Sequence, residues 1–433
     1  MKKLASLLLI PTLLVCIFAA CEMRPPSHST AQKESSVAVI SEPAAEVNLP
    51  TLSICLDLRL HAHDEKDSLF NQVTGQSKDY KLEIMSVPGI RHVEGGEPDS
   101  TERDTFLTSL KTEIMAGKGP DVFISACGTS EALCSIFPYP VQAMNNHLFL
   151  PLDEYLQNSD SIEWDKLFPL VMEKGRNEEG QQLVPLTYAF PLFLYDKEQF
   201  SLQAQRPMTW DEMRTSSEEM VYEPAQYTNL ADLFGESCDY DKDAPAITEK
   251  ELFACCQDYV TIDSPVGETK GVRIQMVGGG LLAMNGPDEG NNVTLEEHGG
   301  QYTMLPIYNL SGGVTANITT FAAINRNTEH PDEAFMVLEY LLSRDAQQHD
   351  DIFKRMLGMP VHMEVCSVDA PMDGRHMSEE NFREFSAIRD QVNAVKFATP
   401  VDEVVNCAIV GPEASQEQVH KQYVTMQMML AES

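Results

Sequence analysis

The residues that most suggest catalysis are two histidines, His61 and His63, which follow an apolar run and precede Asp64. Histidines two residues apart at the end of a strand can hold a metal ion, as metal-dependent hydrolases require. Such a site needs further ligands, and no second histidine pair in a matching context follows along the chain. We therefore favour a structural role for this pair and keep an exported metal-dependent hydrolase as an alternative.

Other sequence signatures of catalysis are missing. The chain has no Gly-x-Ser-x-Gly elbow and no P-loop, and Gly278–Gly280 lacks the spacing of a dinucleotide-binding motif. It also has no Cys-x-x-Cys pair, so neither a zinc ribbon nor a thioredoxin-type redox site is indicated. The sequence thus predicts a protein that is not an enzyme and has no cofactor and no metal site.

A better candidate for a site is the small-residue segment Ser125–Gly128, which follows the apolar run Val122–Ile124. Before this run we expect an amphipathic helix that begins near Thr101 and ends at Gly117, a residue suited to a left-handed turn. A helix that leads into a buried strand is half of a βαβ unit, and open α/β sheets bind ligands at the carboxyl ends of such strands. The predicted apolar face of the helix consists of Phe106, Leu107, Leu110, Ile114 and Met115.

Two earlier segments complete this unit. Thr51–Leu56 and Lys81–Val87 have the composition of strands, and Asp64–Gln76 between them is predicted to be helical. The order strand, helix, strand, helix, strand predicts an α/β fold with a sheet that is parallel in this region.

Further along, short segments of recognisable composition occur in a fixed order. Together they resemble the bacterial extracellular solute-binding proteins of family 1, the maltose-binding-protein-like proteins that deliver sugars to ABC importers. One of them, Met208–Met213, also has Thr209 as a good helix cap with acidic residues in the first turn. The segments are Leu110–Phe123, Pro151–Leu156, Gly180–Pro185, Leu192–Phe200, Met208–Met213, Val277–Pro287, Tyr302–Pro306, Thr315–Ile324, His330–Ala334 and Gly358–Val361.

The resemblance covers about Thr51 to Leu430 and implies a two-lobed periplasmic-binding-protein-like type II fold with three inter-lobe crossings. It assigns residues 50–190 and 317–359 to the first lobe and residues 191–316 and 360–433 to the second. It implies that a small solute, a sugar or oligosaccharide, is captured between the lobes and passed to an ABC permease without chemistry on the ligand. Closure is a population shift, driven by contacts that the ligand makes to both lobes at once.

In such a fold the loops at strand ends line the cleft. Tyr188 and Phe190 lie at the first crossing, where an aromatic ring can stack on the apolar face of a sugar. The predicted ligand-binding residues are Asp57, Arg59, Ser125, Gly128, Tyr188, Phe190, Asn285 and Asp288.

One position departs from the family pattern. Sugar-binding members commonly have an aromatic residue after the Gly-Pro that stands here as Gly286-Pro287, but this chain has Asp288. A non-sugar ligand, such as a peptide, a polyamine or another polar metabolite, therefore stays an open alternative. A surface lipoprotein that binds a protein partner is another.

Residues 1–20 have the pattern of an export signal. Lys2 and Lys3 precede an apolar run, and Phe18-Ala19-Ala20-Cys21 resembles a lipobox, with Phe18 in place of the usual Leu. The resemblance implies that Cys21 carries a lipid, and the Pro- and Ser-rich residues 24–50 predict a flexible tether. We expect a protein on the cell surface, lipid-anchored to the outer face of the bacterial cytoplasmic membrane; a plain secreted protein is the alternative.

The bulk composition limits the partners. Acidic residues number 66 against 31 basic ones, a formal net charge of −35 that argues against nucleic-acid binding and against docking on anionic lipid. A mean hydropathy of −0.23 is typical of a globular protein, which we expect to be a monomer. Besides Cys21, eight cysteines remain after the signal; the sequence leaves their disulfide state open and favours burial of Cys255 and Cys256 as small apolar residues.

Overall fold

The apolar runs predicted as strands near Thr51 and Val122 lie together in a seven-stranded sheet. β1 spans Thr51–Asp57, β2 spans Lys81–Ser86 and β3 spans Val122–Ala126. β1 pairs in parallel with both neighbours, as the sequence predicts, and its Cys55 lies opposite Met85 and Phe123. The computed structural model describes residues 49–58, 80–89, 99–128, 135–197, 207–262, 272–277, 280–283, 302–349, 352, 356, 358–365, 379–409 and 414–432.

The rest of this large sheet makes it mixed rather than purely parallel. Its order is β14-β6-β13-β3-β1-β2, and β15 pairs with β13. The long central strand β13 runs antiparallel to both β3 and β6. Strands β1, β3 and β6 therefore point the same way, and their carboxyl ends share one edge of the sheet. The bounds are Leu183–Ala189 for β6, Val314–Ile324 for β13, Met359–Pro360 for β14 and Val392–Phe397 for β15.

A second, four-stranded sheet has the order β11-β10-β7-β12 and is antiparallel throughout. The chain enters it between β6 and β7 and leaves it between β12 and β13. The three predicted inter-lobe crossings stay a prediction. The strands are β7 (Pro191–Asp196), β10 (Val272–Val277), β11 (Gly280–Ala283) and β12 (Tyr302–Pro306); two hairpins join β4 (Arg176–Asn177) to β5 (Gly180–Gln181) and β8 (Cys238–Asp239) to β9 (Ala244–Pro245).

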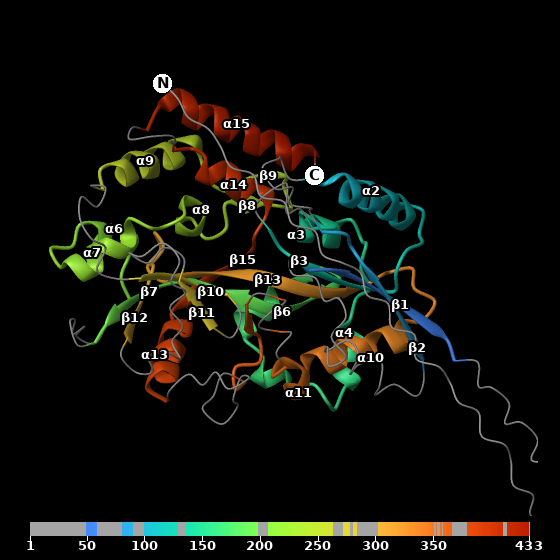
Figure 1. Ribbon diagram of the computed structural model, residues 1–433. Helices are drawn as coiled ribbons and strands as arrows, with labels where there is room; N and C mark the ends of the chain where they lie inside the picture. Colours follow the sequence, from blue (N-terminus) through green and yellow to red (C-terminus); the bar gives the residue numbers. More distant parts are fainter. Residues whose placement is uncertain are drawn as a thin grey trace, which may run out of the picture. The chain divides into compact units, whose positions relative to one another are not determined.

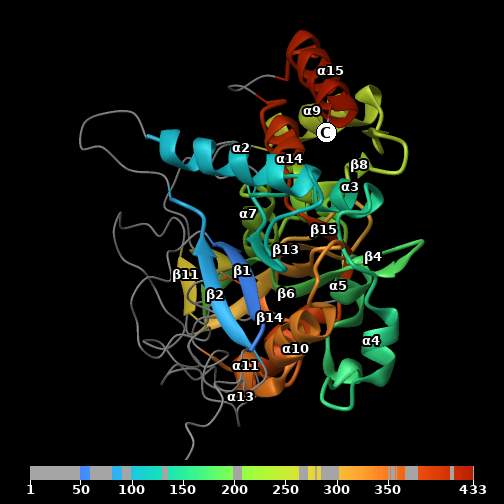
Figure 2. The same ribbon diagram turned by 90° about the vertical axis from the view of Figure 1, so that its right-hand side faces the viewer.

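Helices lie on both sides of β13. On one side are α2, α3, α14 and α15, and on the other are α10, α11 and α13, as both views show (Figures 1 and 2). None of the helices in the described part of the chain is long and apolar enough to cross a membrane. The bounds are α2 Thr101–Met115, α3 Pro140–Asn145, α4 Asp153–Asn158, η2 Trp164–Lys166, α5 Pro169–Glu173, α6 Trp210–Arg214, α7 Glu219–Ala225, α8 Leu230–Leu233, α9 Glu249–Val260, α10 Pro331–Leu342, α11 Arg344–Gln347, α13 Glu379–Arg389, α14 Pro400–Asn406 and α15 Gln416–Glu432.

The helix predicted after Thr101 is confirmed, with one error in its apolar face. Leu107, Leu110 and Ile114 are buried, but Met115 is 87% exposed. Met115 follows Ile114 directly and so points about 100° away from it around the helix, off the buried side. Gly117 has a φ of 73°, the left-handed turn expected at the end of this helix.

Two more local predictions are confirmed. Thr209 caps α6 in a capping box with Glu212, whose carboxylate accepts the Thr209 backbone N–H. The adjacent Cys255 and Cys256 are buried in α9, and burial raises the pKa of the Cys256 thiol to about 12. In α10, the apolar residues Phe335, Leu338, Leu341 and Leu342 are buried too.

Several predictions fall on residues outside the described ranges. These are the signal segment, the lipidation residue Cys21, the tether, the helix expected over Asp64–Gln76, the histidines His61 and His63, and the site residues Arg59, Asn285 and Asp288. Of the eight other cysteines, the six that the structure describes are free thiols: Cys55, Cys127, Cys238, Cys255, Cys256 and Cys407.

Candidate functional site

The shared edge of β1, β3 and β6 brings predicted site residues from three distant segments to one side of the sheet. Asp57 of β1 pairs with Ser125 of β3, and Ser125 lies opposite Phe321 of β13. Across β13, Tyr188 of β6 lies opposite Ile318, three residues before Phe321. Asp57 and Ser125 are therefore neighbours, and Tyr188 lies on the far side of β13 toward the same edge, where open α/β sheets bind ligands.

Asp57 is 3% exposed, and its carboxylate is held by two donors. The Arg103 Nη2 atom of α2 lies 2.8 Å from Asp57 Oδ1 and 3.1 Å from Oδ2, and the Ile136 backbone N–H donates to Oδ2 at 2.8 Å. Burial raises the pKa of the Asp57 carboxyl, and the Arg103 guanidinium acts in the opposite direction. Asp57 thus ties the end of β1 to α2 and to the chain before α3.

All four residues of the segment Ser125–Gly128 are buried. Ser125 is the last but one residue of β3, and its hydroxyl donates to the Ala126 carbonyl at 3.4 Å. The Cys127 backbone N–H donates to the Thr319 carbonyl of β13 at 2.8 Å. Backbone contact with β13 therefore sets the path of the chain as it leaves β3.

The two aromatic residues predicted at the first crossing lie in the core. Tyr188 is 1% exposed and Phe190 is 0% exposed. The Tyr188 ring meets Phe168 edge to face at 5.2 Å between centroids, and Phe190 stacks on Phe385 of α13 at 5.4 Å with nearly parallel planes. In this arrangement neither ring presents a face to a ligand, so stacking stays a prediction that requires these residues to become exposed.

Polar groups on the central strand β13 were missed as site candidates. Asn317 and Thr319 are half-buried in a strand whose other residues are all buried. The Thr319 hydroxyl lies 2.7 Å from that of Thr187 in β6. Thr187 precedes the predicted residue Tyr188, and the Thr319 carbonyl accepts the Cys127 backbone N–H of the predicted segment Ser125–Gly128. The signal was visible as polar residues at alternate positions in the apolar run TANITTFAAI, which is named above only as one of the segments that resemble the family. Amide and hydroxyl groups of this kind orient polar ligands.

A separate groove of about 1130 Å³ lies between α3, α5 and the β4–β5 hairpin on one side and β8 and β15 on the other. The Lys174 Nζ atom reaches across to Glu236 Oε2 at 2.6 Å, and the Asn145 amide donates to Asp241 Oδ1 at 3.1 Å. None of the predicted ligand-binding residues that the structure describes lines it. Most of the charged residues in its lining are acidic: Glu173, Glu178, Glu179, Glu236, Asp239 and Asp241 against Lys174 and Arg176.

Within the described ranges, no group of three or more histidine, cysteine, aspartate or glutamate side chains is placed to hold a metal ion. At the shared carboxyl edge of β1, β3 and β6, the amide of Asn317 and the hydroxyl of Thr319 can form hydrogen bonds with a polar ligand.

Solved structures share this fold. The sugar-binding protein MalE from Xanthomonas citri matches with a TM-score of 0.56 at 13% identity, over 88% of this chain and 98% of that one. An ABC transporter solute-binding protein from Thermotoga lettingae, bound with alpha-D-tagatose, matches with a TM-score of 0.53 at 14% identity, over 88% and 100%. A periplasmic oligogalacturonide-binding protein from Yersinia enterocolitica matches with a TM-score of 0.55 at 11% identity, over 88% and 99%.

The fold is thus that of the type II periplasmic solute-binding proteins. The family model for bacterial extracellular solute-binding proteins matches residues 97–348, more than half of the chain, and the chain belongs to this family. Its members bind solutes for transport and are not enzymes, so the hydrolase alternative built on His61 and His63 is not supported. No curated protein sequence matches the chain.

Proposed function

We propose that this protein captures a sugar or oligosaccharide and delivers it to an ABC importer. The observation that carries the proposal is the common carboxyl edge of β1, β3 and β6 in a chain of this family, with polar residues of β13 beside it. Open α/β sheets bind ligands at the carboxyl ends of their strands, which supports a site at this edge. Structural relatives with named ligands, tagatose and oligogalacturonide among them, support a carbohydrate.

The proposed ligand-binding residues belong to two groups. Ser125 and Gly128 at the end of β3, with Asn317 and Thr319 on β13, are proposed to line the floor of the site, while Asp57 shapes it through Arg103. A second group remains proposed from the sequence: Arg59, Tyr188, Phe190, Asn285 and Asp288.

Capture involves two lobes, with residues 50–190 and 317–359 in the first and residues 191–316 and 360–433 in the second. A ligand that touches both lobes favours the closed state by the difference between its affinities for the two states. Membership of the family supports an extracellular or periplasmic location. We further propose that Cys21 carries a lipid that anchors the chain to the outer face of the cytoplasmic membrane, and that Cys21→Ala releases it in soluble form.

A thermal-shift screen tests the ligand class. The chain without its signal and anchor is heated with tagatose, linear and cyclic maltooligosaccharides, oligogalacturonides, amino acids, peptides and polyamines. A ligand at about 100 times its dissociation constant stabilises the folded state by roughly 2.7 kcal/mol, which is a readily measured rise in Tm. We expect a saccharide to give this rise.

A non-sugar ligand is the second candidate, and two observations favour it. Asp288 stands where sugar-binding members commonly have an aromatic residue, and the groove between α3 and β8 is lined by more acidic than basic residues. A polyamine or a cationic peptide would suit an acidic surface. A rise in Tm with these compounds and none with saccharides would keep the transport role and replace the ligand class.

A further inference from the structure

The central strand β13 has different partners along its two halves. Val314–Ile318 pairs in parallel with β15, whereas Thr320–Ile324 pairs antiparallel with β3. Thr319 belongs to neither ladder. The pairing of β13 with β6 is also irregular here, with shifts of register between Ile318 and Thr320 and between Thr320 and Phe321. Such irregularities bend a strand locally.

A buried cation lies beside the first half of β13. Lys396 of β15 is 5% exposed and lies opposite Asn317 in the ladder. Its ammonium Nζ donates to Asp402 Oδ1 and to the Ala231 carbonyl, both at 2.9 Å, and lies 3.4 Å from Asp232 Oδ1. Burial alone would lower the pKa of Lys396, but Asp402 and Asp232 raise it above its ordinary value, so the side chain stays charged.

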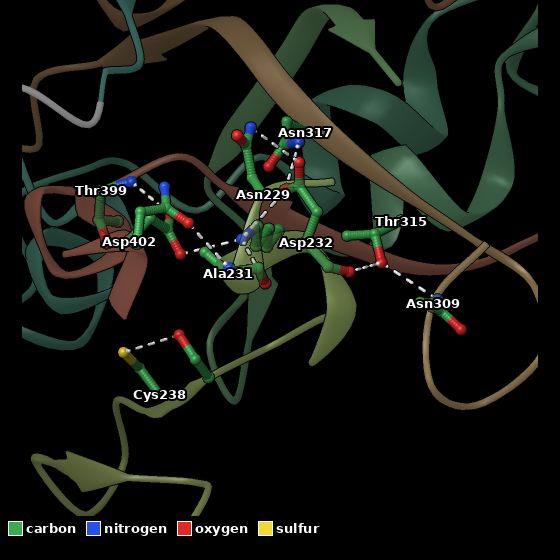
Figure 3. A network of polar contacts seen from close by, with 12 residues as sticks. Asn229, Ala231, Asp232, Cys238, Asn309, Thr315, Asn317, Thr399 and Asp402 are labelled. Atoms are coloured by element: carbon green, nitrogen blue, oxygen red, sulfur yellow. Dashed lines mark hydrogen bonds and ion pairs between the residues drawn. The ribbon is translucent and has the colours of Figure 1, made fainter. Parts of the chain in front are cut away.

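The same carboxylates bind the first half of β13 and the start of α14 (Figure 3). The Asn317 amide donates to Asp232 Oδ1 at 3.1 Å, and the Thr315 hydroxyl donates to the Asp232 carbonyl at 2.7 Å. Asp402 Oδ2 accepts the Thr399 backbone N–H at 2.9 Å. One buried network therefore joins α8, the first half of β13, β15 and the beginning of α14.

The second half of β13 is held by other groups. Beyond its pairing with β3, the Leu150 backbone N–H donates to the Ile324 carbonyl at 2.9 Å. The following residue, Asn325, donates from its backbone to the Asp121 carbonyl at 2.8 Å and from its amide to the Pro120 carbonyl at 3.0 Å. These bonds attach the second half to the elements around α2 and β3.

We propose that Lys396 is a positioning residue that fixes the first half of β13, α8, β15 and α14 as one body, so that β13 bends at Thr319. This inference rests on the proposed function. Closure of the two lobes requires the chain to bend between them, and we assign one such bend to Thr319 of β13. Thr319 also accepts the Cys127 backbone N–H and lies against the Thr187 hydroxyl. A bend at Thr319 is therefore transmitted to the candidate segment Ser125–Gly128 and to β6.

Hydrogen–deuterium exchange of the full ligand-free chain, resolved by overlapping peptides, tests this assignment. In Lys396→Met we expect amide exchange to rise about tenfold across Val314–Ile318, Val392–Phe397 and α8, and to stay within about twofold of wild type across Thr320–Ile324. Lys166→Met is the matched control, because it removes a lysine from a surface ion pair with Glu364, and we expect it to leave both halves unchanged.

A rise of equal size in both halves of β13, or no rise in either, would overturn the proposal. If Lys396→Met does not fold, Asn317→Ala removes a single bond of the network and should give a smaller rise confined to the first half. The measurement uses no ligand. An exchange result that contradicts the role of Lys396 therefore does not contradict sugar binding. A ligand screen without a saccharide hit likewise does not change what the exchange rates say about Lys396.

Discussion

Arg103 and Asp57 form a buried ion pair between α2 and β1, with 2.8 Å between Nη2 and Oδ1. Arg103 also donates from Nη1 to the Pro88 carbonyl at 3.1 Å, just beyond β2. The pair therefore joins a helix to the ends of two adjacent parallel strands. It sets the shape of the sheet edge at which the ligand site is proposed.

Removing one partner of this pair should strongly destabilise the fold. Asp57→Ala leaves the Arg103 guanidinium buried without its carboxylate, and we expect a loss of about 3–5 kcal/mol in the free energy of unfolding. Urea denaturation measures it. The double variant Asp57→Leu with Arg103→Met removes both charges and should lose less than Asp57→Ala alone; a larger loss for the double variant would contradict the role of the uncompensated charge.

The capping box of α6 gives a milder prediction. Thr209→Ala removes the hydroxyl that accepts the Glu212 backbone N–H at 3.1 Å, and we expect a loss of about 1 kcal/mol in unfolding free energy. Thr112→Ala, an exposed change inside α2, is the control and should be neutral or slightly stabilising because alanine favours helix. If Thr209→Ala and Thr112→Ala lost the same unfolding free energy, the hydrogen bond of the Thr209 cap would not stabilise the protein.

Glu179 should make stability depend on pH in the acidic range. Its carboxylate accepts from Arg326 at 2.8 and 3.1 Å and lies 3.0 Å from His147 Nδ1, and these partners lower the pKa of Glu179 from 4.5 to about 2. A carboxyl whose pKa is lowered on folding stabilises the protein above its unfolded pKa and loses that effect as the pH falls.

The Tm difference between wild type and Glu179→Gln should accordingly be full near pH 6 and shrink between about pH 4.5 and 2. Glu178→Gln, at an exposed neighbouring residue, is the control, and its effect should stay small at every pH. A difference for Glu179→Gln that grows toward low pH would contradict the assignment.

Gly358 should tolerate no side chain. A Cβ atom there would lie 2.3 Å from Thr319 Oγ1 and 2.9 Å from Thr187 Cβ, at the meeting point of β6, β13 and β14. We expect Gly358→Ala to cost about 1–3 kcal/mol in unfolding free energy. Adding Thr319→Ala removes the nearest atom and should recover part of the loss, which denaturant titration would show. A strictly additive double variant would mean that the two residues do not meet.

Local features of this fold were predictable because their causes are local. The runs Thr51–Leu56 and Val122–Ile124, the turn at Gly117 and the cap at Thr209 depend on a few adjacent residues, and all four are confirmed. The exposure of Met115 was missed because it was grouped with its neighbour Ile114, although adjacent residues point about 100° apart around a helix.

The site was only partly predictable. The strand-end rule led to Asp57 and Ser125, and the register does place them side by side. Apolar periodicity does not reveal that β13 runs antiparallel to β3 and β6, nor that Thr187 and Thr319, far apart in sequence, meet through their hydroxyls. Nor does it show that Arg103 would occupy the Asp57 carboxylate, because such pairing depends on tertiary packing.

The central claim is that this member of the solute-binding family captures a saccharide. Titration calorimetry of the anchor-free chain against the saccharide with the largest thermal shift tests it most directly. We predict binding of one ligand per chain with a negative heat-capacity change, weakened by Asn317→Ala or Thr319→Ala under conditions where both variants are folded. Saturable binding of a polyamine or peptide, with no heat from any saccharide, would contradict the claim.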